Sequence, residues 1–390
     1  MVTELHCSTG RDSGADPFSQ EISGWLLLTC LPGVGPKTRT ELIQRWPTPS
    51  DLINRNPASL AACGLPSKVV PAIVAWQRRD LGHPVVSKVL WIIEQCRQQA
   101  IQILVWSDPR YPEPLRHIHD APLVLYTQGD VSLLTREQIA VVGSRDATPT
   151  GLALARRFAA ELSEHDLLVT SGLALGVDGA AHAGALDVEA PTLAVIGSGL
   201  DGIYPSRHRP LAQRILRHGL LVSEYPPGTP ARPAHFPQRN RIISGLARGV
   251  LVVEAGLKSG SLITARLALE QGREVFAVPG SVQSPVSRGC HHLIKQGASL
   301  VETVEDILLE LGASWQGPTP ASAEPDPAQP STALAEREIA VFRALGYDPQ
   351  STDALSVATG LSADQLMQSL LLLELQGLVT PVPGGYQRLA

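Results

Sequence analysis

Short apolar runs alternate with longer amphipathic stretches over residues 138–280. The apolar runs are residues 138–143, 167–172, 192–197, 220–225, 249–255 and 274–280. The amphipathic stretches between them are residues 151–164, 177–186, 209–217, 238–247 and 260–271. This alternation predicts a doubly wound α/β domain, in which a mainly parallel sheet is covered by helices on both faces. Nearly every run ends in Gly, Ser or Pro, at the carboxyl edge where open α/β sheets bind ligands.

The chain of 390 residues is too long for one compact core and suits two or three domains. X-Pro turns interrupt residues 107–122, and residues 317–330 are rich in Pro and Ala. Near the C-terminus, helices at 335–344, 351–358 and 363–376 precede a Gly-Gly turn that can close a β wing, with Ser362 as an expected N-cap. The expected parts are a disordered N-terminus (1–20), a helical domain (21–100), the α/β domain (105–312), a linker (313–331) and a winged helix (332–390).

The charge balance places limits on function. The net charge of −5 argues against a protein that coats nucleic acid through its overall charge, so a nucleic-acid site must be a local patch. No apolar run reaches the roughly 18 residues that span a bilayer, and the N-terminus has no signal-peptide pattern. The cysteines are odd in number and form no C-x-x-C pair, so we expect a cytoplasmic protein without a disulfide framework or metal site. They are Cys7, Cys30, Cys63, Cys96 and Cys290.

The first glycine turn, Gly143-Ser144-Arg145, follows an apolar run and precedes a helical stretch. It lacks the G-x-G-x-x-G spacing, and the next run ends in Ser171-Gly172 instead of an acid that would hold a ribose, so we expect no dinucleotide cofactor. Its N–H groups can still face an anion, and Arg145 can add a bidentate phosphate contact. The alternative is that Arg145 forms an ion pair on a helix surface.

Arginine is concentrated between residues 205 and 250, where Glu224 is the only acid. Such a bias predicts an extended track for a polyanion. Within it, Phe236 can stack a base while Arg239, Asn240 and Arg241 clamp phosphates. The alternative places Phe236 in the core and the arginines on a solvated helix face. The arginines are Arg207, Arg209, Arg214, Arg217, Arg232, Arg239, Arg241 and Arg248.

Three further motifs contain residue types that can carry chemistry. The turn at Ser259–Thr264 resembles an anion nest without the Walker spacing, which disfavours ATP hydrolysis. A hydrolase would use Glu254 as general base, and this remains the main enzymatic alternative. Asp178 and His182 are four residues apart, but no nucleophile completes a catalytic pair, so we expect Asp178 to cap a helix and His182 to pack beneath it.

The flanking modules give weaker signals. The Gly33-Val34-Gly35 turn fits either a DNA-binding helix-hairpin-helix or a simple tight turn, and its few basic neighbours favour the tight turn. The helix expected at 363–376 contains Asp364 and Glu374 but no Lys or Arg, which disfavours a DNA-reading role. A protein contact is expected there instead, with a partner that the sequence does not identify.

A series of motifs runs in one order through residues from about 111 to 311: YPEPLRHIHDAPLVLY, AVVGSR, SGLALGVDGAAH, GSGLDGIYP, SEYPPG, FPQRNRIISGL, VVEAGLKSGSLITA, VFAVPG and GCHHLIKQGA. In this order they closely resemble the DprA/Smf family of DNA-processing proteins in natural transformation. The resemblance implies an extended Rossmann-like domain that binds single-stranded DNA, protects incoming strands and loads the RecA recombinase, as a homodimer without enzymatic activity. It also implies a sterile-alpha-motif-like (SAM-like) N-terminal domain and a C-terminal winged helix.

The resemblance also implies which residues bind. The dimer surface would fall at His292, Leu293, Ile294 and Leu300, where exposed apolar side chains would otherwise be a liability. A phosphoribohydrolase on the same core is the alternative, although its P-G-G-x-G-T-x-x-E motif is absent. The expected DNA-binding residues are Gly143, Ser144, Arg145, Ser171, Gly172, Arg207, Phe236, Arg239, Asn240, Arg241, Ser259, Gly260, Ser261 and Thr264.

Overall fold

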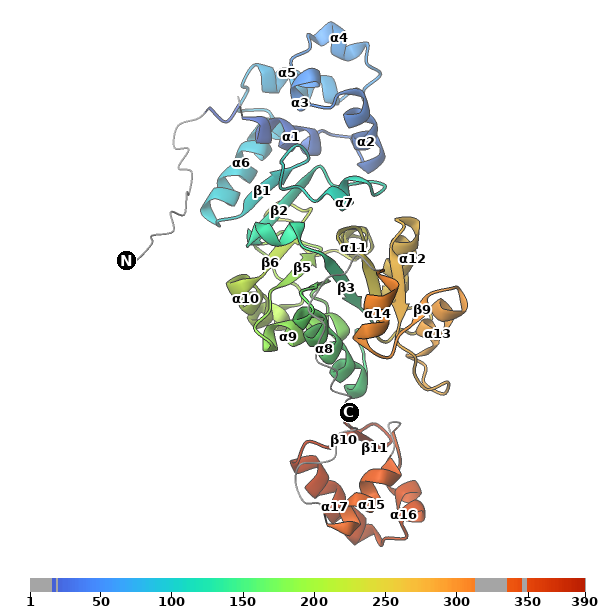
Figure 1. Ribbon diagram of the computed structural model, residues 1–390. Coiled ribbons are helices and arrows are strands. Elements are labelled where there is room, and N and C mark those ends of the chain that lie inside the picture. The colour runs from blue at the N-terminus through green and yellow to red at the C-terminus, as the bar shows by residue number, and fades with distance from the viewer. Residues whose placement is uncertain (1–15, 19, 313–334, 346–348, 390) are drawn as a thin grey trace, which may run out of the picture.

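The structure is a computed structural model, and it describes residues 16–18, 20–312, 335–345 and 349–389 (Figure 1). The linker expected at 313–331 lies outside these residues. So does the N-terminus expected to be disordered, apart from residues 16–18 and 20. No helix within the described residues is both long and apolar enough to cross a membrane.

A nine-stranded sheet forms the centre of the chain, in the order β1-β2-β6-β5-β4-β3-β7-β8-β9. The run from β6 to β9 is parallel, and all six apolar runs of the sequence are confirmed as β3 to β8. Strand β3 pairs with β4 on one side and β7 on the other, so the chain reverses its direction of travel across the sheet there. The strands are β3 (Gln138–Val142), β4 (Leu168–Ser171), β5 (Thr192–Ile196), β6 (Leu220–Ser223), β7 (Gly249–Val252), β8 (Glu274–Ala277) and β9 (Ser299–Leu300).

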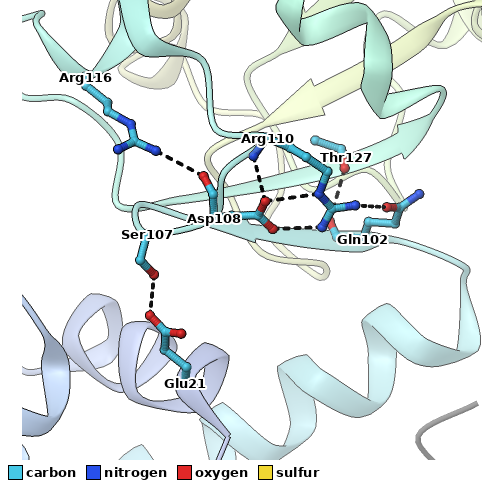
Figure 2. Close-up of polar contacts among 7 residues, drawn as sticks. All are labelled: Glu21, Gln102, Ser107, Asp108, Arg110, Arg116 and Thr127. Carbon is cyan, nitrogen blue, oxygen red and sulfur yellow. Dashed lines mark hydrogen bonds and ion pairs between the residues drawn. The ribbon is translucent and has the colours of Figure 1, made fainter. Parts of the chain in front are cut away.

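Two strands were not predicted. Strands β1 (Gln102–Val105) and β2 (Val124–Gly129) pair antiparallel with each other, and β2 pairs antiparallel with β6. They extend the parallel sheet at one edge and begin the α/β domain three residues earlier than residue 105. The loop between them holds the X-Pro turns, the short helix α7 (Glu113–Arg116) and a bidentate contact between Arg110 and Asp108 (Figure 2).

Helices cover both faces of the sheet because successive strand residues point to opposite faces. On one face Ile139 and Val141 pack against α8 (Pro149–Glu164), α9 (Val177–Asp187) and α14 (Val304–Glu310). On the other face Ala140 and Val142 pack against α11 (His235–Leu246), α12 (Ser261–Glu270) and α13 (Arg288–Lys295). The five helices expected between the strands are confirmed as α8 to α12, with α10 at Arg209–His218.

Six helices form the N-terminal domain and pack on the β1–β2 end of the sheet (Figure 1). At this junction the Trp25 indole N–H donates to Ser107 Oγ at 3.0 Å, and the Ser107 hydroxyl also contacts Glu21 (Figure 2). Gly33 has a φ of +78° in the turn between the first two helices, in agreement with a tight turn. The helices are α1 (Glu21–Cys30), α2 (Pro36–Arg45), α3 (Pro49–Ile53), α4 (Pro57–Ala61), α5 (Val69–Gln77) and α6 (Pro84–Gln98).

The C-terminal domain has the expected three helices and β wing. Ser362 caps its third helix by accepting a hydrogen bond from the Gln365 N–H at 3.4 Å, as predicted. Its core contains Leu366, Leu370 and Leu373 from one face of that helix. The elements are α15 (Glu336–Leu345), α16 (Thr352–Thr359), α17 (Ala363–Leu375), β10 (Val379–Val382) and β11 (Gly385–Arg388).

Candidate nucleic-acid interface

A cavity of about 690 Å³ opens at the carboxyl edge of the sheet, where β3 lies beside β7. We call it the carboxyl-edge pocket. Its walls come from the β3–α8 turn, the loop before α9, the start of α11 and the β7–α12 turn. The position follows the rule that open α/β sheets bind ligands where the strand order reverses. The predicted residues that line it are Gly143, Ser144, Arg145, Phe236, Arg239, Asn240, Ser259, Gly260, Ser261 and Thr264.

The β3–α8 turn is fixed by neighbouring backbone. A Cβ on Gly143 would lie 2.9 Å from the Glu254 carbonyl oxygen and 2.5 Å from a Val177 methyl, so the position needs glycine. The Ser144 N–H donates to the Glu254 carbonyl at 2.6 Å. This N–H is therefore not available to an anion, contrary to the sequence-based expectation. The turn instead holds the Arg145 side chain at the pocket.

Arg145 and two aromatic rings form the polar and apolar surfaces of one wall. The Arg145 guanidinium carbon lies 5.4 Å from the centre of the Phe236 ring, and the Tyr204 and Phe236 rings are 5.7 Å apart. Tyr204 is 54% exposed and Phe236 is only half-buried, so Phe236 is not a core residue. Arg145 is exposed and takes part in no ion pair among the residues described, which removes the alternative of a surface ion pair.

Arg239 lies beneath the pocket and is 4% exposed. Its Nη1 donates to the backbone carbonyls of Gly172 and Val195, while Nε has no hydrogen-bond partner among the described residues. Burial lowers the Arg239 pKa to about 10, and the buried Asp178 carboxylate opposes that shift, so Arg239 stays charged at neutral pH. The Arg239 side chain therefore holds the backbone at the floor of the pocket in place and does not extend into solvent.

Asp178 secures the loop that leads into α9. Its Oδ2 accepts hydrogen bonds from the N–H groups of Gly172 at 3.2 Å and Ala174 at 3.3 Å. The helix itself has Gly176 as N-cap, so the expectation that Asp178 caps it is wrong. Burial raises the Asp178 pKa, and nearby Arg239 opposes the rise. The buried Asp178–Arg239 charges together shape the pocket wall.

The β7–α12 turn supplies hydroxyl groups to the opposite wall. Ser259 Oγ and Ser261 Oγ are 2.7 Å apart, and the Asn240 amide reaches the Gly260 carbonyl at 3.5 Å. Lys258 is exposed on the same turn and lines the pocket. The pocket therefore combines hydroxyls, two exposed cations and an aromatic pair, which suits a ligand with phosphates and flat bases. Lys258 and Tyr204 were not predicted as site residues, although both lie inside motifs on which the family resemblance rests.

The comparison with known proteins decides the family. Residues 102–312, more than half of the chain, match the family model for DNA recombination-mediator protein A. The chain belongs to the DprA/Smf family. Residues 324–385 match the model of the DprA winged helix domain, in agreement with the wing described above. The family and the α/β fold predicted from the sequence are confirmed, and DNA processing is the general function of this DprA/Smf protein.

Several relatives extend over most of the chain. Protein Smf of Escherichia coli K12 is 45% identical over 319 residues, which are 80% of this chain and 83% of that protein. DNA processing protein DprA of Streptococcus pneumoniae is 48% identical over 203 residues, which are 52% of this chain and 72% of that protein. The X-ray structure of DprA from Streptococcus pneumoniae covers 75% of this chain and 98% of its own, with 36% identity and a TM-score of 0.64.

Four predicted DNA-binding residues of this DprA/Smf protein lie outside the pocket lining. Ser171 is buried and donates to the Val141 carbonyl, and Gly172 lies under the Arg239 guanidinium. Arg241 pairs with Glu224 and is 11% exposed. It differs from Arg239 because residues two apart on a helix face different sides. Arg207 is exposed in the short helix at Ser206–His208 and is not part of the lining.

The predicted arginine track is also corrected. Arg214 pairs with Asp187 at 3.2 Å beside α9, and Arg248 pairs with Glu137 at 2.9 Å at the start of β7. The start of a parallel strand lies at the opposite sheet edge from the pocket. The arginine-rich segment is therefore divided among several surfaces, and only Arg239 of that segment lines the pocket.

The two candidate catalytic residues Glu254 and His182 form hydrogen bonds to neighbouring threonines inside the domain. Both Glu254 carboxylate oxygens accept hydrogen bonds from Thr148, at 2.8 Å from its N–H and 2.6 Å from its hydroxyl, and Glu254 does not line the pocket. His182 is fully buried with Nδ1 2.8 Å from Thr192 Oγ1, and burial lowers its pKa to about 3. The packing role predicted for His182 agrees with this placement. Glu254 is therefore not placed to act as the general base that a hydrolase at this pocket would need.

The expected dimer surface lies on α13 and β9. Strand β9 is the outer edge of the sheet, where Leu300 is 49% exposed. His292 is exposed and Ile294 is half-buried. Leu293 is only 4% exposed and packs in the core, so its assignment to the interface is wrong.

Proposed function

We propose that this protein binds single-stranded DNA in the carboxyl-edge pocket without catalysing a reaction, protects incoming strands during natural transformation and loads RecA on them in the cytoplasm. The observation that carries the proposal is the aromatic pair beneath a free guanidinium, with Arg145 5.4 Å from the Phe236 ring centre. The DNA-processing names of the relatives support it.

Recognition would divide between bases and phosphates. A base stacks on the half-exposed faces of Tyr204 and Phe236, while Arg145 and Lys258 hold the flanking phosphates. Each stacked base contributes about 1–3 kcal/mol, and every base has a flat face, so binding is largely independent of sequence. A duplex keeps its base faces covered, and this favours a single strand.

Dimerisation through β9 would place two pockets in one particle. Two chains joined at this edge would bury the exposed Leu300 and the half-buried Ile294, which are in contact with water in a single chain. We expect Leu300→Asp to shift the protein from dimer to monomer in analytical ultracentrifugation, because a carboxylate at a buried apolar contact carries a large desolvation cost. Leu309→Asp is the control, since Leu309 is 78% exposed on α14. Equal dimerisation of both variants would rule out this surface.

The winged helix would contact a protein. Its helix α17 has no Lys or Arg, and Leu371, Leu372 and Leu375 are 57%, 44% and 76% exposed on it. The phosphate backbone of nucleic acid offers no match for an apolar surface that carries no cation. The proposal does not assign an identity to this partner.

RecA loading is tested on single strands covered with single-strand-binding protein. We expect the wild type to shorten the delay before RecA hydrolyses ATP, and Arg145→Ala to restore most of that delay. Arg217→Ala, an exposed arginine on α10 outside the pocket, is the control. An unchanged delay with wild type contradicts the loading role, and release of free base from nucleoside monophosphates contradicts the non-catalytic role.

A further inference from the structure

A second cavity, of about 260 Å³, lies at the opposite edge of the sheet from the carboxyl-edge pocket. We call it the amino-edge cavity. Its floor is formed by residues that come just before β3, β7 and β8, and parallel strands begin at the same edge. The loop between β1 and β2, with the X-Pro turns and α7, forms its roof. No residue of the proposed DNA site lines it.

Four arginines from four separate segments line the amino-edge cavity, against two carboxylates, Glu113 and Glu137. Arg248 pairs with Glu137 at 2.9 Å, and Arg116 lies 3.6 Å from Glu113. Arg136 pairs with Asp166, which lies outside the lining, and Arg273 has no carboxylate partner among the described residues. One of the four positive charges is therefore left without a carboxylate at this cavity, in a protein whose overall charge is −5. The four are Arg116, Arg136, Arg248 and Arg273.

Two of these guanidinium groups keep an unused donor. Arg273 Nη2 donates to the carbonyls of Pro114 at 3.1 Å and Gly245 at 3.2 Å, and Arg116 Nη2 donates to the Asp108 carbonyl at 3.0 Å (Figure 2). The Nε atoms of both side chains are buried and have no hydrogen-bond acceptor among the described residues, although Arg116 Nε lies 3.6 Å from the Glu113 carboxylate. Backbone contacts thus hold the two arginines in place while each retains a buried donor.

The arrangement is electrostatically costly without an anion. Burial, and then the neighbouring charge of Arg248, lower the pKa of Arg273. A buried donor on a charged group that lacks an acceptor destabilises the fold, because the group has lost its hydrogen bond to water without a replacement. An oxyanion between the guanidinium groups would accept from the free donors and oppose the like charges.

The chemistry and size select the kind of anion. Guanidinium groups match the spacing of phosphate oxygens and bind them through paired hydrogen bonds. A volume of about 260 Å³ is smaller than the usual drug-sized site and suits a phosphate group with little attached to it. We propose that the amino-edge cavity is a second, independent anion site that binds a phosphate monoester group. The phosphate comes either from a free anion or nucleotide, or from the 5′ end of a DNA strand.

Isothermal titration of the full-length protein tests this site with three probes: inorganic phosphate, thymidine monophosphate, and oligothymidylate with or without a 5′ phosphate. The Arg145→Ala background removes the proposed contribution of the carboxyl-edge pocket. In that background we expect phosphate to bind one site per chain, and Arg248→Gln to weaken it about tenfold or more, the loss expected for a charged hydrogen bond. Arg217→Gln is the matched control outside both cavities.

The probes separate the two sources of phosphate. A preference for the 5′-phosphorylated over the 5′-hydroxyl oligonucleotide identifies a strand end, whereas equal binding of phosphate and thymidine monophosphate without such a preference identifies a free anion. If Arg248→Gln does not fold, Glu137→Gln provides the second test: it removes the negative charge beside Arg248 and should tighten phosphate binding several-fold. No phosphate binding by wild type, or no response to either substitution, overturns the proposal, and loss of DNA binding in Arg145→Ala does not affect it.

Discussion

Replacing Arg239 by Met is expected to lower the free energy of unfolding by about 1.5–3 kcal/mol, the range for hydrogen bonds made by a charged group. The substitution removes the guanidinium that donates to the carbonyls of Gly172 and Val195. It also leaves the buried Asp178 carboxylate without the cation that most opposes its burial. Urea unfolding followed by circular dichroism measures the change.

A double variant shows where this energy comes from. Adding Asp178→Asn to Arg239→Met removes the unpaired charge while the amide can still accept from the loop N–H groups, so part of the lost stability should return. Arg217→Met is the control at an exposed position of α10. A loss below about 1 kcal/mol for Arg239→Met, within the range of an ordinary surface change, would contradict the role assigned to Arg239.

Replacing Phe236 by Ala is expected to weaken binding of oligothymidylate by about 1–3 kcal/mol, or roughly 5- to 150-fold, because one base loses its stacking surface. Phe236 contacts the Tyr204 ring and lies beneath Arg145, so its loss also removes the support of both. Stability should change less than affinity, since the ring is only half-buried. Fluorescence anisotropy with a labelled oligonucleotide gives the affinity.

Phe236→Leu separates stacking from simple packing. Leucine keeps apolar volume but has no flat π-face, so it should recover stability without recovering affinity. Exposed Val282, at 75% exposure on the loop after β8, provides Val282→Ala as the control. Affinity within twofold of wild type for Phe236→Ala would show that no base stacks on this ring.

The sequence patterns predicted the central fold because apolar runs and helical stretches alternate clearly from β3 to β8. Strands β1 and β2 were not predicted from the sequence, because they are antiparallel and flank the X-Pro loop. That loop interrupts the periodic pattern on which the prediction of the other strands rests. The pocket position was predictable for a related reason: the ends of parallel strands meet at one edge, which brings Gly143 and Ser259 together.

The direction of long side chains was harder to predict. Arg239 and Arg241 stand in one basic motif, yet one lies under the pocket and the other pairs with Glu224, 17 positions away in sequence. The partner that fixes each arginine comes from a distant segment, and no local pattern shows it. Leu293 was misplaced for the opposite reason, because an apolar residue in an edge segment can face the core as easily as a partner.

The central claim is that the carboxyl-edge pocket binds single-stranded DNA. Fluorescence anisotropy across a salt series, with the same oligonucleotide as single strand and as duplex, tests it most directly for wild type and Arg145→Ala. We predict tighter binding of the single strand, an affinity that falls as salt rises, and a clear loss of affinity with a smaller salt dependence in Arg145→Ala. Equal affinity for single strand and duplex, or unchanged binding by Arg145→Ala, would contradict the account.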